Sequence, residues 1–198
     1  HLSTRRQRQM CIRDSCSSLG YLYLNRSYDE PGMLVKARQM MELALEHARL
    51  HGHRRNIGVE VAQLGMVFFR QGEIEESVLH LEEAVELLQD DDPRLLAQYQ
   101  LVLAEFLSWL GEAGRARELL VVGRAVLAAE PGSPNEGEVR CIEGHVAWGA
   151  GDDEAAAAML AAADAIRTQN SLPEDGDLGR SIAALRDRIA SGKRSGAA

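Results

Sequence analysis

The stretch from Asn56 to Leu88 decides the fold; it reads NIGVEVAQLGMVFFRQ and then GEIEESVLHLEEAVELL. In both halves apolar residues recur at steps of three and four positions, the spacing that places them on one face of a helix. Gly72 lies at the break between the halves, and glycine is common where a helix ends. We therefore expect a hairpin of two amphipathic helices.

The second half of this hairpin contains a triplet that recurs along the chain. A small residue, a large apolar residue and another small residue follow at steps of four and three, and the triplets recur after 40, 39 and 40 residues. They are Ala37/Met41/Ala44, Ser77/Leu81/Ala84, Ala116/Leu120/Gly123 and Ala156/Leu160/Ala163. A fixed period of this size is typical of solenoids, whose units bury their apolar faces by stacking on neighbours. We predict an all-α fold, an α-solenoid of about four helical hairpins with a C-terminal capping helix.

Turn residues set the expected boundaries of this array. The hairpins are expected at about residues 16–52, 53–92, 93–132 and 135–170, with a capping helix over 177–190. Asp152 is a natural N-cap for the last of the paired helices, and Gly65 inside a helix indicates the close approach of a neighbouring helix. Residues 1–15 lack the repeat pattern and are predicted to be a non-native or disordered segment, and residues 191–198 a disordered tail.

The same spacing assigns buried faces to individual helices. The core positions expected in the third hairpin are Leu96, Leu103, Leu107, Leu119, Val122 and Val126. In the capping helix, Leu178, Ile182, Leu185 and Ile189 are expected to face inward, and Arg180, Arg186, Asp187 and Arg188 to face solvent. A terminal repeat requires such a polar outer face.

Composition and charge argue against several kinds of partner. The chain has 22 basic and 30 acidic residues, a formal net charge of −8, which disfavours nucleic acid and anionic membrane surfaces. It contains no apolar run long enough to span a bilayer. The three cysteines, Cys11, Cys16 and Cys141, are odd in number and lack the spacing of metal ligands, which favours a reducing, cytoplasmic location.

No pattern in the sequence points to catalysis or to a bound cofactor. His47 and His51 share a helix face, but a zinc-hydrolase motif needs a glutamate directly after the first histidine, and Ala48 is there. Histidines near a helix C-terminus are instead favourable to the helix dipole. We expect a protein that is not an enzyme and that has no catalytic residue, metal ligand or cofactor.

Seven residues of the Asn56–Leu88 stretch resemble the tetratricopeptide repeat (TPR): Leu64, Gly65, Phe68, Gly72, Ser77, Leu81 and Ala84. The family's tryptophan in the first helix and proline after the second are not reproduced, and the period is about 40 rather than 34 residues. With this longer period the chain resembles the carboxy-terminal repeat tails of large bacterial signalling and regulatory proteins. The resemblance implies a protein-interaction scaffold that is a fragment of such a protein. The alternative is an effector-sensing domain that binds a small molecule and controls a missing catalytic or DNA-binding domain.

The resemblance also implies where a protein or peptide partner binds. Similar arrays hold a peptide or a partner helix in the groove lined by the first helix of each hairpin. The residues so placed are Tyr21, Met66, Phe69, Arg70, Glu105, Ser108, Trp109, His145 and Trp148. Trp109 and Trp148 either contribute binding energy there or pack between hairpins. At the N-terminal end, Leu19, Leu22 and Leu24 are expected to expose apolar surface through which two copies self-associate.

Overall fold

The computed structural model describes residues 2–127 and 131–192, with side chains from residue 11 onwards. This described part consists of nine α-helices and contains no β-strand, so the expected all-α fold is confirmed. The helices are α1 (Leu2–Arg26), α2 (Met33–His51), α3 (Arg54–Gln71), α4 (Ile74–Leu88), α5 (Pro93–Trp109), α6 (Ala113–Val126), α7 (Pro134–Gly149), α8 (Asp153–Gln169) and α9 (Asp177–Ser191). None of the helices in these ranges combines the length and the apolar composition that a bilayer span demands.

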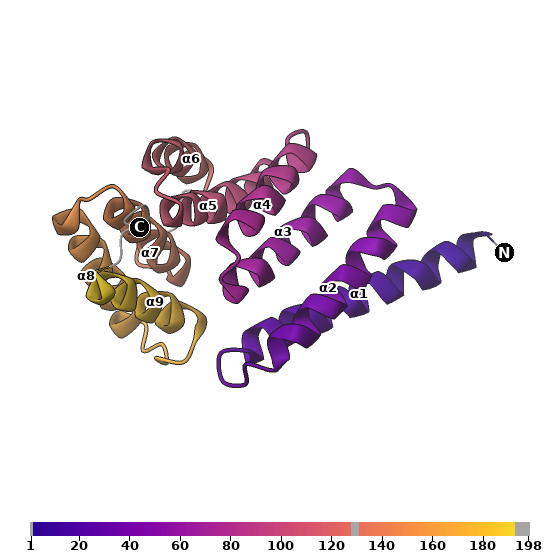
Figure 1. Ribbon diagram of the computed structural model, residues 1–198, viewed down its shortest axis with the longest axis horizontal. Helices are drawn as coiled ribbons and strands as arrows, with labels where there is room; N and C mark the ends of the chain where they lie inside the picture. Colours follow the sequence, from indigo (N-terminus) through magenta and orange to yellow (C-terminus); the bar gives the residue numbers. More distant parts are fainter. Residues whose placement is uncertain (1, 128–130, 193–198) are drawn as a thin grey trace. The chain divides into compact units, whose positions relative to one another are not determined.

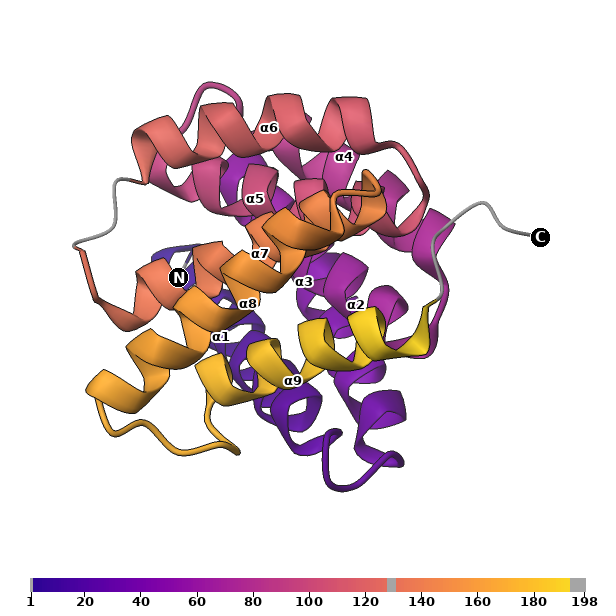
Figure 2. The same ribbon diagram turned by 90° about the vertical axis from the view of Figure 1, so that its left-hand side faces the viewer.

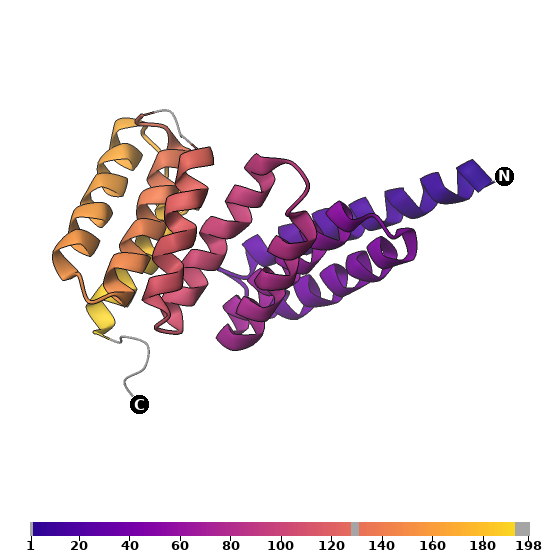
Figure 3. The same cartoon turned by 90° about the horizontal axis from the view of Figure 1, so that it is seen from above.

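Consecutive helices pack as pairs: α1 with α2, α3 with α4, α5 with α6 and α7 with α8 (Figure 1). The chain divides into two compact units, His1–Asp92 with α1 to α4 and Pro93–Ala198 with α5 to α9. In the first unit, α2 and α3 join the two hairpins (Figure 3). In the second unit, α5 and α7 join them, and α9 packs against α7 and α8 (Figure 2). Each unit is a stack of helical hairpins, and the second ends in a further helix.

Helices end where the sequence contains turn and capping residues. Gly52 and Gly72 follow α2 and α3 with φ angles of 70° and 83°, and their backbone N–H groups donate to carbonyls of the preceding turn. Glycine adopts this left-handed conformation without a steric penalty. Asp152 caps α8 as expected, because its carboxylate accepts a hydrogen bond of 3.0 Å from the N–H of Ala155.

The recurring triplets lie in the cores of the hairpins. All their members are buried except Leu120 and Leu160, which are half-buried. Gly65 lies at a close approach, as expected: a Cβ there would be 3.2 Å from the carbonyl oxygen of Ser77 and equally close to the Cβ of His80 on α4. Small residues at these positions therefore allow the two helices of a hairpin to approach each other.

Helix α6 differs from the expectation at two core positions. Val122 and Val126 are 50% and 38% exposed. Gly123 is buried instead, because it lies directly against Leu101 of α5. The two valines are displaced from Gly123 by about 60° to 100° around the helix and therefore lie outside the contact.

The N-terminal end also differs from the expectation. Helix α1 begins at Leu2 and so covers residues 2–15, for which we predicted a non-native or disordered segment; whether these residues are native stays a prediction. Leu19 and Leu22 are exposed, but Leu24 is buried. Leu24 lies one turn beyond Gly20, whose position adjoins Met41 of α2. Self-association through this end stays a prediction that rests on Leu19 and Leu22. The tail expected over 191–198 lies, from residue 193 on, outside the described residues.

Gly149, the last residue of α7, allows a test of the close packing in the second unit. A Cβ there would lie 2.7 Å from the carbonyl oxygen of Ser108 in α5, so the two helices must separate to admit it. We expect Gly149→Ala to lower the free energy of unfolding by about 1–3 kcal/mol in urea denaturation. Gly114→Ala on α6 is the control, because a Cβ there meets nothing within 4 Å, and it should stabilise by at most about 1 kcal/mol. Equal effects of the two substitutions would contradict the packing described.

Candidate functional site

The nine predicted groove residues belong to two different units. Tyr21, Met66, Phe69 and Arg70 lie on α1 and α3, whereas Glu105, Ser108, Trp109, His145 and Trp148 lie on α5 and α7. In the second unit, four of the five surround the side chain of one residue of α9, Arg188. We call Glu105, Ser108, Trp109 and His145 the arginine socket.

The arginine socket holds the guanidinium group through oxygen acceptors and an aromatic face. Arg188 Nη2 donates a hydrogen bond of 2.6 Å to the carbonyl oxygen of Ser108, and Nη1 donates to Ser108 Oγ at 2.8 Å. Nη1 also donates to the carbonyl oxygen of His145 at 3.2 Å. The centre of the guanidinium lies 3.9 Å from the centroid of the Trp109 ring. Arginine suits this site because its planar group stacks on aromatic rings while its N–H donors reach several acceptors.

The end of α5 explains why a helix carbonyl at this place accepts a hydrogen bond from a side chain. The helix ends at Trp109, and the last four carbonyls of a helix have no acceptor role within it. The carbonyl of Ser108 is one of these, and Arg188 donates to it. The partial negative charge at a helix C-terminus also attracts a cation. The site is therefore built from the end of one helix and completed by a side chain from another.

Arg188 faces inward, so its predicted place on the solvent side of the capping helix is wrong. It is 3% exposed, and it takes the buried position that we assigned to Ile189, which is half-buried. Helical spacing allows either residue to face inward, because residue 188 follows Leu185 by three positions and residue 189 follows it by four. The choice depends on tertiary structure, since an arginine satisfies the carbonyl of Ser108 and an isoleucine does not.

Burial shifts the ionisation of the charged groups at the socket. Glu105 Oε1 lies 3.7 Å from His145 Nε2. Burial raises the pKa of Glu105 to about 7, although the charge of Arg188 opposes this. Burial, together with the charge of Arg188, lowers the pKa of His145 to about 3. Burial also lowers the pKa of Arg188 to about 10, which Glu105 partly offsets. At neutral pH the socket contains a charged guanidinium, a neutral imidazole and a partly ionised carboxyl group.

The hydrogen bonds of the socket serve to hold a side chain. His145 Nδ1 lies 3.3 Å from Arg188 Nη1; because arginine only donates, Nδ1 accepts and the imidazole proton is on Nε2. Ser108 Oγ donates to the carbonyl oxygen of Glu105 at 2.5 Å, so its proton is directed to a backbone carbonyl. Burial raises the pKa of Cys141 to about 12, which keeps its thiol protonated. In the described ranges, no three His, Cys, Asp or Glu side chains are placed to bind a metal ion.

The remaining predicted residues differ in how much surface they present. Trp148 is 6% exposed and thus packed inside the second unit. In the first unit Tyr21 is 49% exposed, and Met66, Phe69 and Arg70 are half-buried. Arg70 is held by the loop after α1: its guanidinium lies 3.4 Å from the centroid of the Tyr28 ring. The role of these residues in partner binding stays a prediction.

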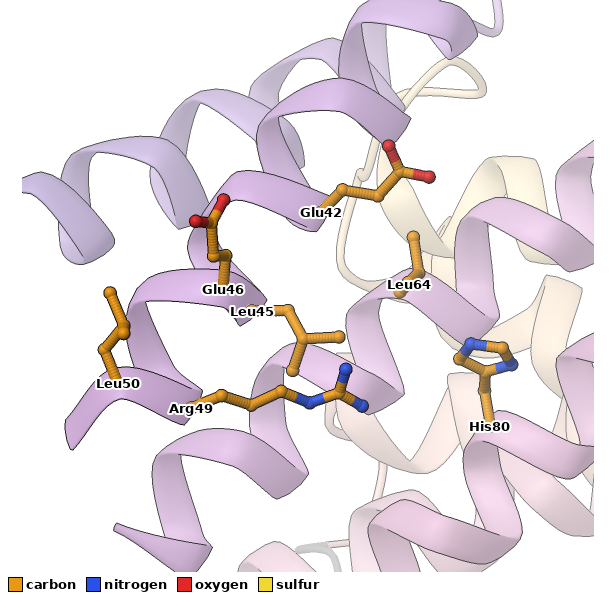
Figure 4. Close-up of a pocket in the computed structure, with 7 residues that line it drawn as sticks. All are labelled: Glu42, Leu45, Glu46, Arg49, Leu50, Leu64 and His80. Carbon is orange, nitrogen blue, oxygen red and sulfur yellow. The ribbon is translucent and has the colours of Figure 1, made fainter. Parts of the chain in front are cut away.

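The first unit also contains a cavity that the sequence did not indicate (Figure 4). It has a volume of about 520 Å³ and is lined by Glu42, Leu45, Glu46, Arg49, Leu50, Leu64 and His80. None of the predicted groove residues lines it. Arg49 lies 3.7 Å from Glu83, and Arg38 lies 2.9 Å from Glu42, so two of its charged residues are already in ion pairs. Leu45, Leu50 and Leu64 supply the apolar part of its lining; Leu45 and Leu64 are buried, whereas Leu50 is exposed.

The opposite pKa shifts of Glu105 and His145 predict two opposing effects of pH on stability. The raised pKa of Glu105 means that its ionisation lowers the free energy of unfolding as the pH rises from about 4.5 to 7. The lowered pKa of His145 means that stability rises with pH between about 3 and 6.5. Each slope is about 1.4 kcal/mol per pH unit at most. In the wild-type chain they cancel where the ranges overlap.

Glu105→Gln should therefore reveal the histidine slope. We expect the free energy of unfolding of this variant, measured by urea denaturation, to rise with pH from about 3 to 6.5. His145→Gln is the matched variant and should instead lose stability between about pH 4.5 and 7. Profiles that run parallel in the wild type and both variants would show that neither group is shifted by its surroundings.

Comparisons with known proteins agree with the architecture. No family model and no characterised protein of similar sequence matches the chain. Among solved structures it is similar to BtubC (BKLC) from P. vanneervenii, with a TM-score of 0.57 and 24% identity, over 77% of this chain and 65% of the length of BtubC. It is also similar to the nearly identical TPR-like repeats of a predicted kinesin light chain from Podosopora anserina, with a TM-score of 0.61 and 18% identity, over 89% and 87% of the two chains. At these identities the likeness concerns the fold: the chain has the architecture of a TPR-like α-solenoid.

Proposed function

We propose that this chain is a non-catalytic protein-interaction scaffold and part of a larger bacterial signalling or regulatory protein of the cytoplasm. The observation that carries the proposal is the likeness to TPR-like repeats over 89% of the chain. Stacked helical repeats present extended surfaces on which a second polypeptide can lie. The contacts of the arginine socket agree with this proposal, because its polar groups hold a side chain of the same chain.

The first unit offers the more open part of the predicted groove. Tyr21 on α1 is exposed, and Met66 and Phe69 on α3 are half-buried. Partly exposed aromatic side chains contribute much of the binding energy when a partner covers them. The net charge of −8 favours a peptide with an excess of positive charge over a polyanion. The partner we propose is therefore a basic peptide segment of another protein.

Selection from a displayed peptide library against the full chain tests this proposal. We expect enrichment of basic peptides that contain apolar residues, and a loss of affinity of about tenfold or more in Tyr21→Ala or Phe69→Ala, since aromatic anchors carry most of the energy. Val121→Ala is the matched control, because Val121 is an apolar residue 70% exposed on α6, a second helix of a hairpin. The proposed groove would be refuted if the library yields no specific peptide, or if the selected peptides bind the Tyr21→Ala and Phe69→Ala chains as tightly as the wild type.

The cavity of the first unit favours a second candidate, an effector-sensing domain. Its apolar wall of Leu45, Leu50 and Leu64 suits the body of a small molecule (Figure 4). Glu46 also lines the cavity and takes part in none of the ion pairs formed by the described residues. We infer that an amine with an apolar body is the class of effector that would fit.

Thermal-shift screening with primary and quaternary amines tests the second candidate. A ligand that binds only the folded chain at a hundred times its Kd stabilises it by about 2.7 kcal/mol, which corresponds to a rise in Tm of a few degrees. Glu46→Gln should abolish the rise, whereas Glu75→Gln, on α4 and outside the cavity lining, should keep it. An unchanged Tm with every amine would exclude this effector class.

A further inference from the structure

Helix α9 docks in the second unit as a ligand helix would. One face of the helix carries Leu178, Ile182, Leu185 and Arg188, and all four are buried. Its contacts are with α7 and α8, together with the bonds of Arg188 to the end of α5. This is the pattern of an amphipathic helix in a groove, with anchors about one turn apart.

Helix α7 is shaped to receive this face. Gly137 lies against Leu178, and Gly144 lies against Leu185, so close that a Cβ at either glycine would collide with the leucine. Between the two glycines, Cys141 belongs to the same buried cluster as Leu178 and Ile182. The two notches are seven residues apart, two turns of α7, and their spacing matches that of the two leucines on α9.

The arginine socket holds the C-terminal end of α9, but it does not supply an acceptor for every N–H group of Arg188. The Nε atom of Arg188 is buried and has no hydrogen-bond partner among the described atoms. No carboxylate of the described residues lies within ion-pair distance of its guanidinium, whose hydrogen bonds go to carbonyl and hydroxyl oxygens and to His145 Nδ1. A buried donor without an acceptor weakens the docked state. The socket therefore recognises arginine, but it leaves one N–H donor of Arg188 without an acceptor in the described part of the chain, which reduces the stability of docked α9.

Helix α9 follows the last hairpin along the chain and is joined to it by a short segment. Residues 170–176 between α8 and α9 contain Ser171 at a φ of 51° and Pro173. Undocking would separate α9 from α7, α8 and the end of α5, while the α5–α6 and α7–α8 pairs keep their own contacts. A tethered helix of this kind competes with a free ligand at an effective concentration in the millimolar range.

We propose that the notched face of α7 and the arginine socket form a binding site for an amphipathic helix of a partner protein, and that α9 is its internal occupant. The partner helix carries apolar residues at positions 1, 5 and 8 and an arginine at position 11, the spacing of Leu178, Ile182, Leu185 and Arg188. This inference rests on the proposed scaffold function and names the class of partner for the second unit. Lysine at the last position binds less well, because it cannot stack on Trp109 and reach two acceptors at once.

A peptide of residues 177–192 labelled with fluorescein, titrated into the full chain, tests the proposal by anisotropy. The wild-type chain should bind it weakly, because its own α9 fills the site. In the Arg188→Ala chain the docking of its own α9 is weakened, because α9 loses the hydrogen bonds of the charged guanidinium while the added peptide keeps them. This chain should therefore bind the peptide about tenfold or more tightly than the wild type does. Arg186→Ala, an exposed arginine of the same helix, is the control chain and should behave like the wild type.

Variant peptides test the role of the arginine itself. On the Arg188→Ala chain, a peptide with Arg188→Ala or Arg188→Lys should bind about tenfold more weakly than the native peptide. Equal binding of the three peptides, or equal binding of the native peptide by the three chains, would overturn the proposal. Hydrogen exchange of the wild-type chain gives a second readout that does not depend on a variant. Amides of α9 should exchange faster than those of α7, and equal protection of the two helices would show that α9 never leaves.

The two proposals fail in different ways. Peptides selected through Tyr21 and Phe69 bind the first unit and do not depend on α9. If such peptides bind but the α9 peptide never does, the scaffold function stands and the exchange of α9 is refuted. If neither kind of peptide binds, both proposals are refuted.

Discussion

The close contact of helix faces that carry small residues is the constraint on which each unit depends. An amphipathic helix of three or four turns is marginal alone and gains its stability by covering its apolar face. At Gly65, Gly123 and Gly144 the neighbouring helix comes so near that a Cβ would be crowded. Glycine inside a helix lowers helix propensity, so these positions exchange local stability for packing between helices. The triplets of the second helices extend the same principle along the chain.

The second unit shows how such packing creates a polar site. Gly149 lets the end of α7 approach the end of α5, and this brings the carbonyls of Ser108 and His145 to the same side chain of α9. A buried cation is costly unless acceptors surround it. The carbonyl oxygens, the serine hydroxyl and the Trp109 ring supply this environment without a direct ion pair. The guanidinium is suited to it because it is more weakly hydrated than an ammonium group.

The first unit presents two different surfaces to solvent. Tyr21 and Phe69 belong to the groove in which the first helices of the hairpins are predicted to bind a peptide. The cavity lined by Leu45, Leu64 and His80 contains none of the predicted groove residues. An extended partner requires a long row of side chains, whereas a small molecule requires a concave apolar site. The predicted groove residues and the cavity therefore lie at different residues of the unit, and each supports a separate proposal.

The sequence by itself determined the all-α repeat, the helix ends at Gly52 and Gly72, and the cap at Asp152. These features depend on local periodicity and on the backbone preferences of single residues, so they are readable without coordinates. The resemblance to the tetratricopeptide repeat also implied that Glu105, Ser108, Trp109 and His145 lie on the first helices of their hairpins, along one predicted groove. Only the tertiary structure decided that Arg188 joins them and that Val122 stays outside, because helical spacing leaves neighbouring positions equivalent until another helix supplies the contact.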